Sequence, residues 1–377
     1  MALTPRQLNR ATLARQLLLG RQPLNVVDGV RRIVALQAQE AASPYLALWN
    51  RIADFDPAEL DGAFARHEIV KATLIRVTLH AVAIEDHPAF KEAMQGTLRS
   101  ARLDDRRFRR TGLSSADADA LLPEVLAYAS QPRTNAELEA WLDQRLGELP
   151  KPSVWWALRQ YGPFAHAVTG PPWSFGPRPA YVAAPGPPAP GDPAGSLQHL
   201  ARRYLEGFGP ASAEDLAQFA LIRRPVAREA LAGLGSSIER IEGPDGRALF
   251  DVPGGPRPDE GAPAPPRLMA MWDSVLLAYA DRSRVIAPEH RQHVMRRNGD
   301  VLPTVLVDGY VCGVWRPVDD GIEVTAFRTL SGDTWDELAA EARSLVAFLA
   351  EREPGIYRRY AHWWTTLPSA EVTVLPA

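Results

Sequence analysis

The chain has 377 residues, 46% of them hydrophobic and 23% charged, which is the composition of a globular protein of roughly two to four domains. A formal net charge of −3 does not identify a nucleic-acid binder, and a single cysteine excludes an internal disulfide, which fits a reducing cytosol. No stretch approaches the ~20 apolar residues of a membrane-spanning helix, and the N-terminus does not resemble a signal peptide.

The first 112 residues have the order of several helices followed by strands. Residues 4–20 are expected to be helical, with Thr4 as the N-cap, and a second helix is expected over 23–37. A further helix restarts at Ser43-Pro44, and another covers ELDGAFARHEIV (59–70). The alternating, β-branched segment 72–84 predicts one or two strands, so residues 1–112 predict a winged-helix module.

A basic stretch, TLRSARLDDRRFRRT, covers residues 97–111 and holds six arginines against two aspartates. A solvated helix face is the simpler interpretation, and a surface that contacts phosphates is the alternative. The candidate contacts are Arg106, Arg107, Arg109 and Arg110, with Arg296 and Arg297 in the C-terminal region.

Arginine is also unusually common in the whole chain, because only three of the 42 cationic residues are lysines. A GC-rich coding sequence explains such a bias. The functional alternative is that the planar guanidinium group binds two phosphate oxygens at once.

The order of helices and strands then recurs twice. Residues 113–185 contain predicted helices at 114–129, 134–146 and 152–162, followed by two strands around a Gly/Pro-rich turn. After a Pro/Gly-rich linker, residues 195–253 contain helices at 196–210, 212–220 and 225–235 and a hairpin that turns at Pro244-Asp245-Gly246. We therefore predict three tandem winged-helix modules.

A second linker, 253–267, precedes a region of different character, residues 267–377. It is rich in predicted strands, with Asp308-Gly309 as a hairpin turn, and it carries a long amphipathic helix over 334–352. We expect a β-rich, barrel-like domain with one helix, which makes the fold class α+β.

The common catalytic signatures are absent from the sequence. There is no G-x-S-x-G, no G-x-x-x-x-G-K-[ST] and no dinucleotide fingerprint. An exposed helix face explains His290 and His293 better than a metal site does, so we expect neither a metal nor a cofactor. Two aromatic clusters, WW at 155–156 and YRRYAHWW at 357–364, are explained better by core packing than by the stacking of bases.

The segment Gln37-Ala38-Gln39 lies between two predicted helices. In a continuous helix the two glutamine side chains would point about 200° apart, whereas in an extended segment they would face the same way. Two convergent amides can hold a water molecule, but they cannot protonate a poor leaving group. The simpler interpretation is a helix C-terminal cap, with Glu40 as a solvent-exposed neighbour that points away in the extended case.

Three segments resemble the AlkZ-like family of bacterial winged-helix DNA glycosylases: LQAQEAASPYLALW (36–49), RVTLHAVAIEDHPAF (76–90) and WDSVLLAYADRSRVI (272–286). The resemblance extends over essentially the whole chain. It implies excision of purines alkylated at N7 from double-stranded DNA, with Gln37 and Gln39 as the catalytic pair. A sister branch has Asp at the second position, so Gln39 implies the branch that acts on bulky adducts or interstrand crosslinks and protects producers of DNA-alkylating natural products.

The resemblance also implies a C-shaped arrangement of the modules around duplex DNA and a β-hairpin that approaches the minor groove, for which Asp308 and Gly309 are the candidates. The arginines named above become candidate DNA contacts. We expect a monomer in the bacterial cytoplasm, associated with the nucleoid.

The implied chemistry fits two amides. An N7-alkylated guanine already carries a positive charge, so its glycosidic bond breaks without a general acid. No lysine lies near the glutamines in the sequence, since Lys71 and Lys91 are the two lysines of residues 1–112, so we expect a monofunctional hydrolase without a Schiff-base step. The sequence shows no aromatic residue beside the glutamines to stack a flipped base, and base flipping is not assumed.

The main alternative is a winged-helix transcriptional regulator without catalysis, because repeated winged helices bind DNA equally well. The mostly apolar helix predicted over 152–162 argues against groove recognition by the second module. A protein-interaction scaffold, the third possibility, would show no salt-dependent affinity for DNA.

Overall fold

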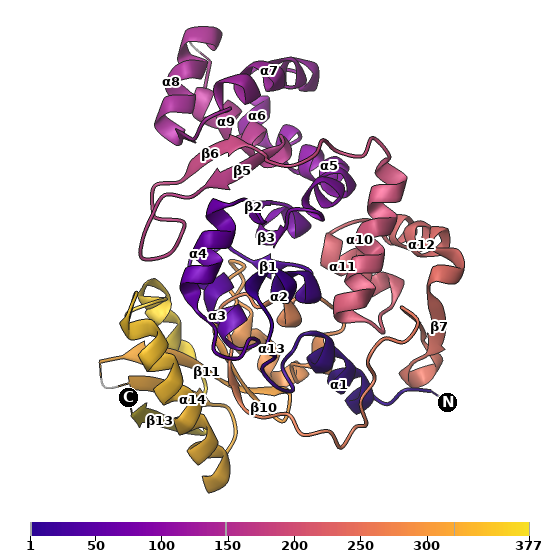
Figure 1. Cartoon of the computed structure of the whole chain (residues 1–377), viewed down its shortest axis with the longest axis vertical. Coiled ribbons are helices and arrows are strands. Elements are labelled where there is room, and N and C mark those ends of the chain that lie inside the picture. Colours follow the sequence, from indigo (N-terminus) through magenta and orange to yellow (C-terminus); the bar gives the residue numbers. More distant parts are fainter. Residues whose placement is uncertain (1, 148, 320, 377) are drawn as a thin grey trace.

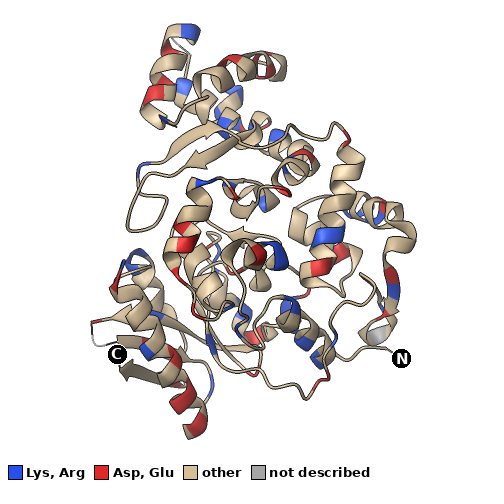
Figure 2. Cartoon of the chain, viewed as in Figure 1, with Lys and Arg blue, Asp and Glu red and all other residues tan. Residues whose placement is uncertain are grey.

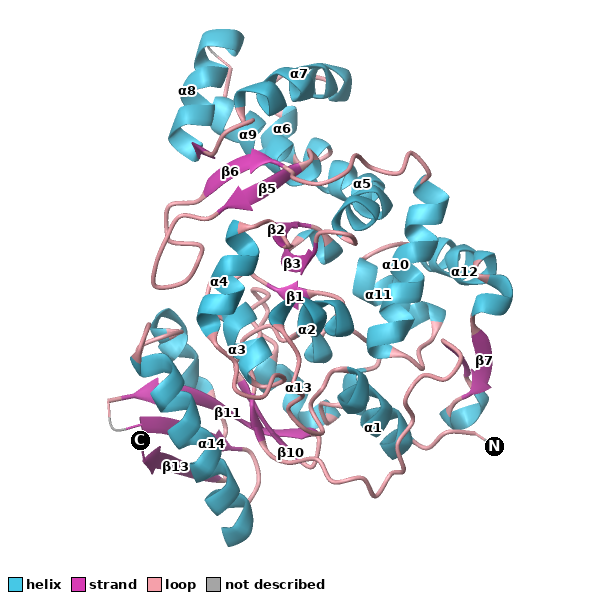
Figure 3. Ribbon diagram, in the orientation of Figure 1, coloured by secondary structure: helices cyan, strands magenta, loops and turns pink. Residues whose placement is uncertain are grey.

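The computed structural model describes residues 2–147, 149–319 and 321–376 (Figure 1). Three successive units of helices and small sheets are followed by a larger sheet covered by a long helix (Figure 3). The first unit lies centrally, with the second and third units and the C-terminal region placed around it (Figure 1). In the described ranges, no helix has both the length and the apolar character needed to cross a membrane.

The first unit combines short helices with a sheet of order β1-β3-β2. Its elements are α2 (Val26–Ile33), β1 (Leu36–Gln37), α3 (Ser43–Trp49), α4 (Pro57–Ala65), β2 (Ile69–Thr73) and β3 (Leu79–Ala83), followed by α5 (His87–Leu103) and α6 (Arg106–Arg109). The helix that precedes them, α1 (Pro5–Arg15), begins at the predicted Thr4 cap, ends five residues before the predicted end, and packs against α10 of the third unit.

The second and third units repeat this order. The second contains α7 (Ser115–Tyr128), β4 (Arg133–Thr134), α8 (Asn135–Leu146), α9 (Lys151–Tyr161), β5 (Phe164–Ala167) and β6 (Ala180–Ala183). The third contains α10 (Pro193–Phe208), α11 (Ala213–Ala220), α12 (Arg224–Gly233), β7 (Glu239–Glu242) and β8 (Ala248–Asp251). Capping boxes at Ser114, Thr134 and Ser212 start three of these helices.

All three units share one topology. In each, the residues just before the second helix pair with the last strand of the hairpin: β1 with β3, β4 with β6, and Ala211 with Phe250 of β8. The sequence pattern predicted only that the three units share an order of helices and strands. The structure shows that they also share this strand pairing.

The C-terminal region contains an open five-stranded antiparallel sheet of order β13-β12-β11-β10-β9. Its elements are β9 (Arg267–Leu268), α13 (Pro288–Val294), β10 (Thr304–Val307), β11 (Tyr310–Val318), β12 (Gly321–Ala326), α14 (Gly332–Ala350) and β13 (Glu371–Pro376). Since β9 and β13 are separate edges and α14 packs across the sheet, the expected barrel-like closure is wrong. The sequence pattern also predicts strands over residues 268–286, but only Leu268 lies in one, at the end of β9, and the rest of that segment contains short 3-10 turns (η4, Ser274–Leu276; η5, Arg282–Arg284).

The sheet of the first unit separates two hydrophobic cores. Its register aligns Leu36 with Ala81 and Lys71, and it aligns Gln37 with His80 and Ala72. Aligned residues on neighbouring strands point to the same face of a sheet, and successive residues of one strand point to opposite faces. Leu36, Ala81 and Lys71 therefore face one side, and Gln37, His80 and Ala72 face the other. The core that includes the C-terminal sheet takes Leu36, Ala81 and Ile69, and the core shared with the second and third units takes Val70, Ala72 and Val82.

Helix α2 ends four residues earlier than predicted, at Ile33. The next residue, Val34, has φ 76° and ψ −56°, and the Ala35 N–H donates to the Ile33 carbonyl at 3.0 Å, which forms a γ-turn. A β-branched residue rarely adopts a positive φ. Val34 is fully buried, and a Cβ at Gly207 of α10 would lie 2.5 Å from its Cγ2, so packing by the third unit holds this turn.

We expect Gly207→Ala to destabilise the protein. The added methyl group would overlap Val34, and overpacking typically costs about 1–3 kcal/mol, more than the roughly 1 kcal/mol that alanine gains over glycine in a helix. The control is Gly96→Ala in α5, where a Cβ meets no heavy atom within 4 Å, and it should be stabilising. Urea unfolding measures both variants, and equal changes in the two free energies of unfolding would contradict this account.

Candidate active site

A polar pocket of about 580 Å³ begins where β1 ends, and both glutamines of the QAQ segment line it. Three parts of the chain contribute its walls. The first unit supplies Gln37, Gln39, Thr73, Val77, Thr78, Leu79 and Arg102; the second unit supplies Arg159, Gln160, His166 and Tyr181; the C-terminal region supplies Trp272, Asn298, Gly299, Asp300, Arg359 and Tyr360. The structure therefore brings the two glutamines together on one site.

The two glutamines have different surroundings. Gln37 is 4% exposed, and its Oε1 accepts a hydrogen bond of 2.8 Å from the backbone N–H of Gln39. The intervening Ala38 is buried and its N–H donates to Leu79 at 2.8 Å. Gln39 is exposed, and its side chain has no hydrogen-bond partner among the described residues. The side-chain amide of Gln37 is thus fixed by its hydrogen bond to the backbone of Gln39, and the side-chain amide of Gln39 faces the pocket without a partner among the described residues.

The histidines nearest the glutamines are uncharged. His80, the partner of Gln37 in the sheet, is fully buried, and burial and the charge of Arg76 lower its pKa to about 3. Burial, together with the charges of Lys71 and Arg159, holds the pKa of His166 well below its usual value. Neither imidazole is a protonated acid at neutral pH.

Glu40 is not the solvent-exposed neighbour that the sequence suggested. Its carboxylate accepts a hydrogen bond of 2.8 Å from the Tyr360 hydroxyl and forms an ion pair with Arg359. Burial, and then this carboxylate, raise the pKa of Tyr360. The charge of Glu40 is therefore paired, and the residue is not a free general base.

Aromatic residues do lie beside the glutamines, although none is near them in the sequence. Trp272 and Tyr360 meet edge to face with ring centroids 5.6 Å apart, and Tyr181 also lines the pocket. Trp272 has a positive φ of 56°, and its indole N–H donates to the Gly299 carbonyl at 2.8 Å. The expectation that no aromatic residue flanks the site is wrong, because these rings come from the C-terminal region and the second unit.

Arg102 and Arg159 make one wall of the pocket strongly cationic, and Arg107 lies next to Arg102 without lining the pocket. The guanidinium groups of Arg102 and Arg107 lie 4.8 and 5.3 Å from the ring centroid of Trp156, and Arg159 lies nearby on α9. Burial lowers the pKa of Arg102; Asp105 opposes this, and the charges of Arg107 and Arg159 add to it. None of the three forms an ion pair within 4 Å in the described part of the chain. We call Arg102, Arg107 and Arg159 the arginine cluster.

The other predicted arginines lie at the margin of this pocket or outside it. Arg106, Arg109 and Arg110 are exposed around α6, and Arg109 pairs with Asp104 at 3.0 Å. Arg296 and Arg297 lie in a turn whose tip, Asn298 to Asp300, lines the pocket. Sequence reasoning missed Arg102 and Arg159, although Arg102 lies within the basic stretch 97–111.

The hairpin at Asp308-Gly309 forms as predicted, but it lies against α1. The Asp308 carboxylate pairs with Arg6 at 2.7 Å and with the buried Arg10, and the Gly309 carbonyl accepts from Asn9 at 2.9 Å. Its tip is thus covered by α1 and does not line the pocket. The β2–β3 hairpin does, through Val77 and Thr78 of its turn, where Arg76 and Val77 both have positive φ. Such strain is concentrated at functional sites.

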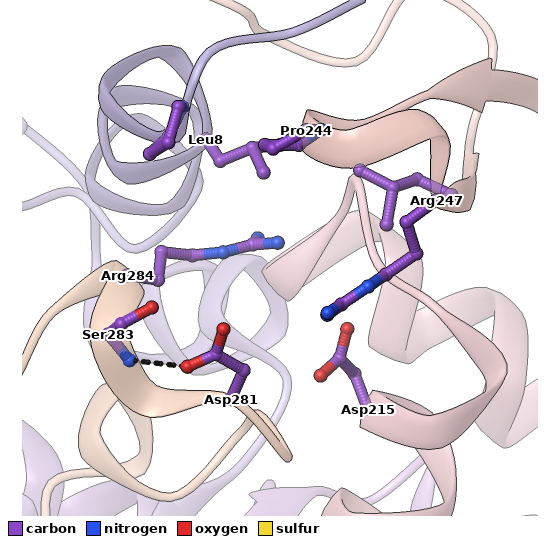
Figure 4. A pocket seen from close by; sticks show the side chains of 9 residues that line it. Leu8, Asp215, Pro244, Arg247, Asp281, Ser283 and Arg284 are labelled. Atoms are coloured by element: carbon purple, nitrogen blue, oxygen red, sulfur yellow. Dashed lines mark hydrogen bonds between the residues drawn. The ribbon is translucent and has the colours of Figure 1, made fainter. Parts of the chain in front are cut away.

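A second pocket of about 180 Å³ lies between α1, α11 and the β7–β8 hairpin (Figure 4). Figure 4 shows Arg247 extending toward Asp215, with Asp281 and Arg284 on the neighbouring wall. Asp215 already accepts hydrogen bonds from Ser212 and from the Ala280 N–H. Charges of both signs face one another here, and the glutamines are elsewhere, so this pocket is the weaker candidate.

Within the described residues, no group of three or more His, Cys, Asp or Glu side chains could hold a metal ion. His290 and His293, the pair considered from the sequence, both pack against the ring of Phe327, with centroids 5.0 and 5.7 Å away.

Comparisons with known proteins agree on one family. A family profile described as "DNA glycosylase AlkZ-like" matches residues 30–348, which include both glutamines. An interstrand DNA cross-link repair glycosylase from Streptomyces sahachiroi is 25% identical over 347 residues, covering 85% of this chain and 90% of that protein. The solved structure of Streptomyces sahachiroi DNA glycosylase AlkZ matches with a TM-score of 0.77 at 22% identity, over 94% of this chain and 99% of that one.

We expect Lys71 to make stability depend on pH. Its ammonium group lies 4.5 Å from the ring centroid of Phe175, and burial lowers its pKa to about 8, against a smaller opposing effect of Glu40. Between about pH 8 and its unfolded pKa near 10.4, the unfolded chain binds more protons at this site, so Lys71 makes stability rise with pH. Lys71→Met should be more stable than wild type at pH 7.5, and the difference should shrink by pH 10. Urea unfolding at several pH values tests this, and a pH-independent difference would contradict it.

Proposed function

This chain belongs to the AlkZ-like family of DNA glycosylases, and we propose that it hydrolyses the N-glycosidic bond of N7-alkylated purines in double-stranded DNA. Bulky adducts or interstrand crosslinks are the proposed substrates, which the similarity to an interstrand cross-link repair glycosylase supports. We further propose a role in self-resistance to DNA-alkylating natural products, on the ground of Gln39 at the second position of the motif. The observation that carries the proposal is the convergence of Gln37 and Gln39 on one open polar pocket.

The pocket suits a leaving group that needs no proton. Water adds to C1′ of the deoxyribose, the bond from C1′ to N9 breaks, and its electron pair neutralises the cationic purine, while a proton passes from the water to solvent. We assign the placing of this water to the side-chain amides of Gln37 and Gln39. The nearby acids and bases are otherwise engaged: Glu40 pairs with Arg359, and Asp300 accepts hydrogen bonds from Trp363 and Asn298.

The position of Lys71 supports a monofunctional hydrolase. The residue lies on the row of the sheet that faces away from Gln37, beneath Phe175, and it is not among the residues that line the pocket. A Schiff base with C1′ would require an amine within reach of the sugar. The open pocket also supports a reaction on a lesion too large to rotate into an enclosed site, so base flipping is not part of the proposal.

We propose that the three units are winged-helix modules with boundaries at 1–112, 113–185 and 195–253, and that with residues 267–377 they form a C-shaped surface around duplex DNA. Their shared sheet topology supports this. The β2–β3 hairpin replaces Asp308-Gly309 as the segment proposed to approach the groove. The proposed phosphate contacts are the arginine cluster and Arg297, with Arg106, Arg109, Arg110 and Arg296 on its margins.

A regulator without catalysis is the less favoured function. The α9 helix buries Val154, Trp155 and Leu158, so this third helix of the second unit presents few polar side chains that could recognise bases in a groove. A pocket lined by two convergent amides would have no evident purpose in such a protein.

Replacing either glutamine should abolish excision. We expect Gln37→Ala and Gln39→Ala to lower the single-turnover release of N7-alkylguanine by about 100-fold or more, because a misplaced reactant costs on that order. Gln39 is exposed, so its replacement should leave the melting temperature unchanged. The control is Gln131→Ala, an exposed glutamine between α7 and β4. Normal release by both active-site variants would exclude the proposed mechanism.

The arginine cluster should account for part of the salt dependence of DNA binding. For Arg102→Gln and Arg159→Gln, we expect the slope of log affinity against log salt concentration to become shallower by about 0.9 for each lost phosphate contact. Arg343→Gln, which removes an exposed arginine from α14, is the matched control. Fluorescence anisotropy with an undamaged duplex measures the slopes independently of catalysis, and slopes equal to that of wild type would place the DNA elsewhere.

A further inference from the structure

We propose that the C-terminal segment Tyr357–Tyr360 is a positioning element that holds the loop carrying Gln39 in its active conformation. We call residues 38–42, between β1 and α3, the glutamine loop. The inference rests on the proposed function for its catalytic consequence, and it adds Tyr357 and Tyr360 as positioning residues that act through the loop.

The centre of the glutamine loop is tied to the C-terminal segment at Glu40. The Tyr360 hydroxyl donates to the Glu40 carboxylate at 2.8 Å, and the Arg359 guanidinium pairs with the same oxygen. These partners are about 320 residues apart in the sequence. Glu40 follows Gln39 directly, so any displacement of its carboxylate also moves the backbone that carries the second amide.

The far end of the loop is tied to the same segment at Ser43. The Ser43 and Tyr357 hydroxyls form a buried hydrogen bond of 2.9 Å, and the Met271 N–H donates to the Tyr357 oxygen at 3.3 Å. Tyr357 has a positive φ of 60°, which is unusual for a bulky residue. The backbone adopts this conformation where the ring enters the core and its hydroxyl reaches Ser43.

The loop has few bonds of its own with which to keep this shape. Ala38 is held by Leu79, and Gln39 by the side chain of Gln37. From Gln39 to Ala42 the backbone belongs to neither a strand nor a helix, and one bond from the Ser43 N–H to the Glu40 carbonyl, at 3.2 Å, closes the turn. Tyr357 and Tyr360 therefore supply the side-chain bonds that restrict the second half of the loop.

The same segment also faces the pocket. Arg359 and Tyr360 line it, and the ring of Tyr360 meets that of Trp272, another lining residue, edge to face. The wall that would meet a lesion and the loop that would place the water are thus joined through one short stretch of chain. Because the carboxylate of Glu40 is paired with Arg359, we assign Glu40 a role in fixing the position of the glutamine loop.

The test uses hydroxyl deletions in the full-length protein, Tyr357→Phe and Tyr360→Phe, which keep both rings. We expect each to lower the single-turnover excision rate by about 10- to 100-fold, with the Kd for lesion-containing duplex within twofold of wild type. Hydrogen exchange at the amides of residues 39–42 should become faster in both. Melting temperatures identify any variant that fails to fold. Tyr360→Phe preserves the test if Tyr357→Phe is unstable, because the hydrogen bond of Tyr360 to Glu40 is only partly buried, whereas that of Tyr357 to Ser43 is buried.

The control is Arg358→Gln in the same segment. Its side chain is 71% exposed and faces the exposed Asp319 at 3.7 Å, so excision and loop exchange should both match wild type. Unchanged rates and unchanged exchange in the two tyrosine variants would overturn the inference, as would a loss confined to DNA affinity. If wild type itself released no alkylated base, the proposed function would fail, whereas the exchange measurements would still decide whether the segment holds the loop.

Discussion

The whole site depends on the end of α2 at Ile33. If the helix continued, Gln37 and Gln39 would point to different sides, and no pocket would contain both. The γ-turn at Val34 prevents this, in a conformation that a β-branched residue adopts at a cost of about 1–3 kcal/mol. That cost is offset by burial of Val34 against Gly207, which belongs to the third unit. A neighbouring unit therefore determines the backbone of the proposed catalytic segment.

The two-residue strand β1 transmits this constraint to the glutamines. Its pairing with β3 directs Leu36 to the core shared with the C-terminal sheet, and it aligns Gln37 with the buried His80. A slip of one residue would exchange the two faces and bury an amide in an apolar core. The anchored Gln37 then supports Gln39 through its own side-chain oxygen. Packing on both faces of one small sheet thus sets the geometry of two amides.

The arginines of the chain serve two separate purposes. Some neutralise buried carboxylates, as in the pairs Arg15–Asp251 and Arg51–Asp273, whose side chains are almost completely buried. In the arginine cluster, Arg102 and Arg159 line the pocket, and none of the three arginines has a carboxylate partner among the described residues, which suits a polyanion. Figure 2 shows cationic and anionic residues interspersed over the molecule, in keeping with its small net charge. The role of an arginine in this chain therefore depends on its surroundings. Neither a GC-rich coding sequence nor phosphate binding explains every arginine.

Short-range patterns were sufficient for most helix starts and the repeated order of elements, because caps, periodicity and turns act within a few residues. They did not single out Gln37 and Gln39, whose catalytic role came from the family resemblance and stays a proposal. Long-range packing decided where α2 ends, how the C-terminal sheet stays open, and that Asp308 binds α1. It also brought Arg159, Trp272 and Tyr360 to the pocket. These contacts join residues separated by more than a hundred positions in the sequence. Such contacts produce no periodic pattern in the sequence, because they form only when the units pack together.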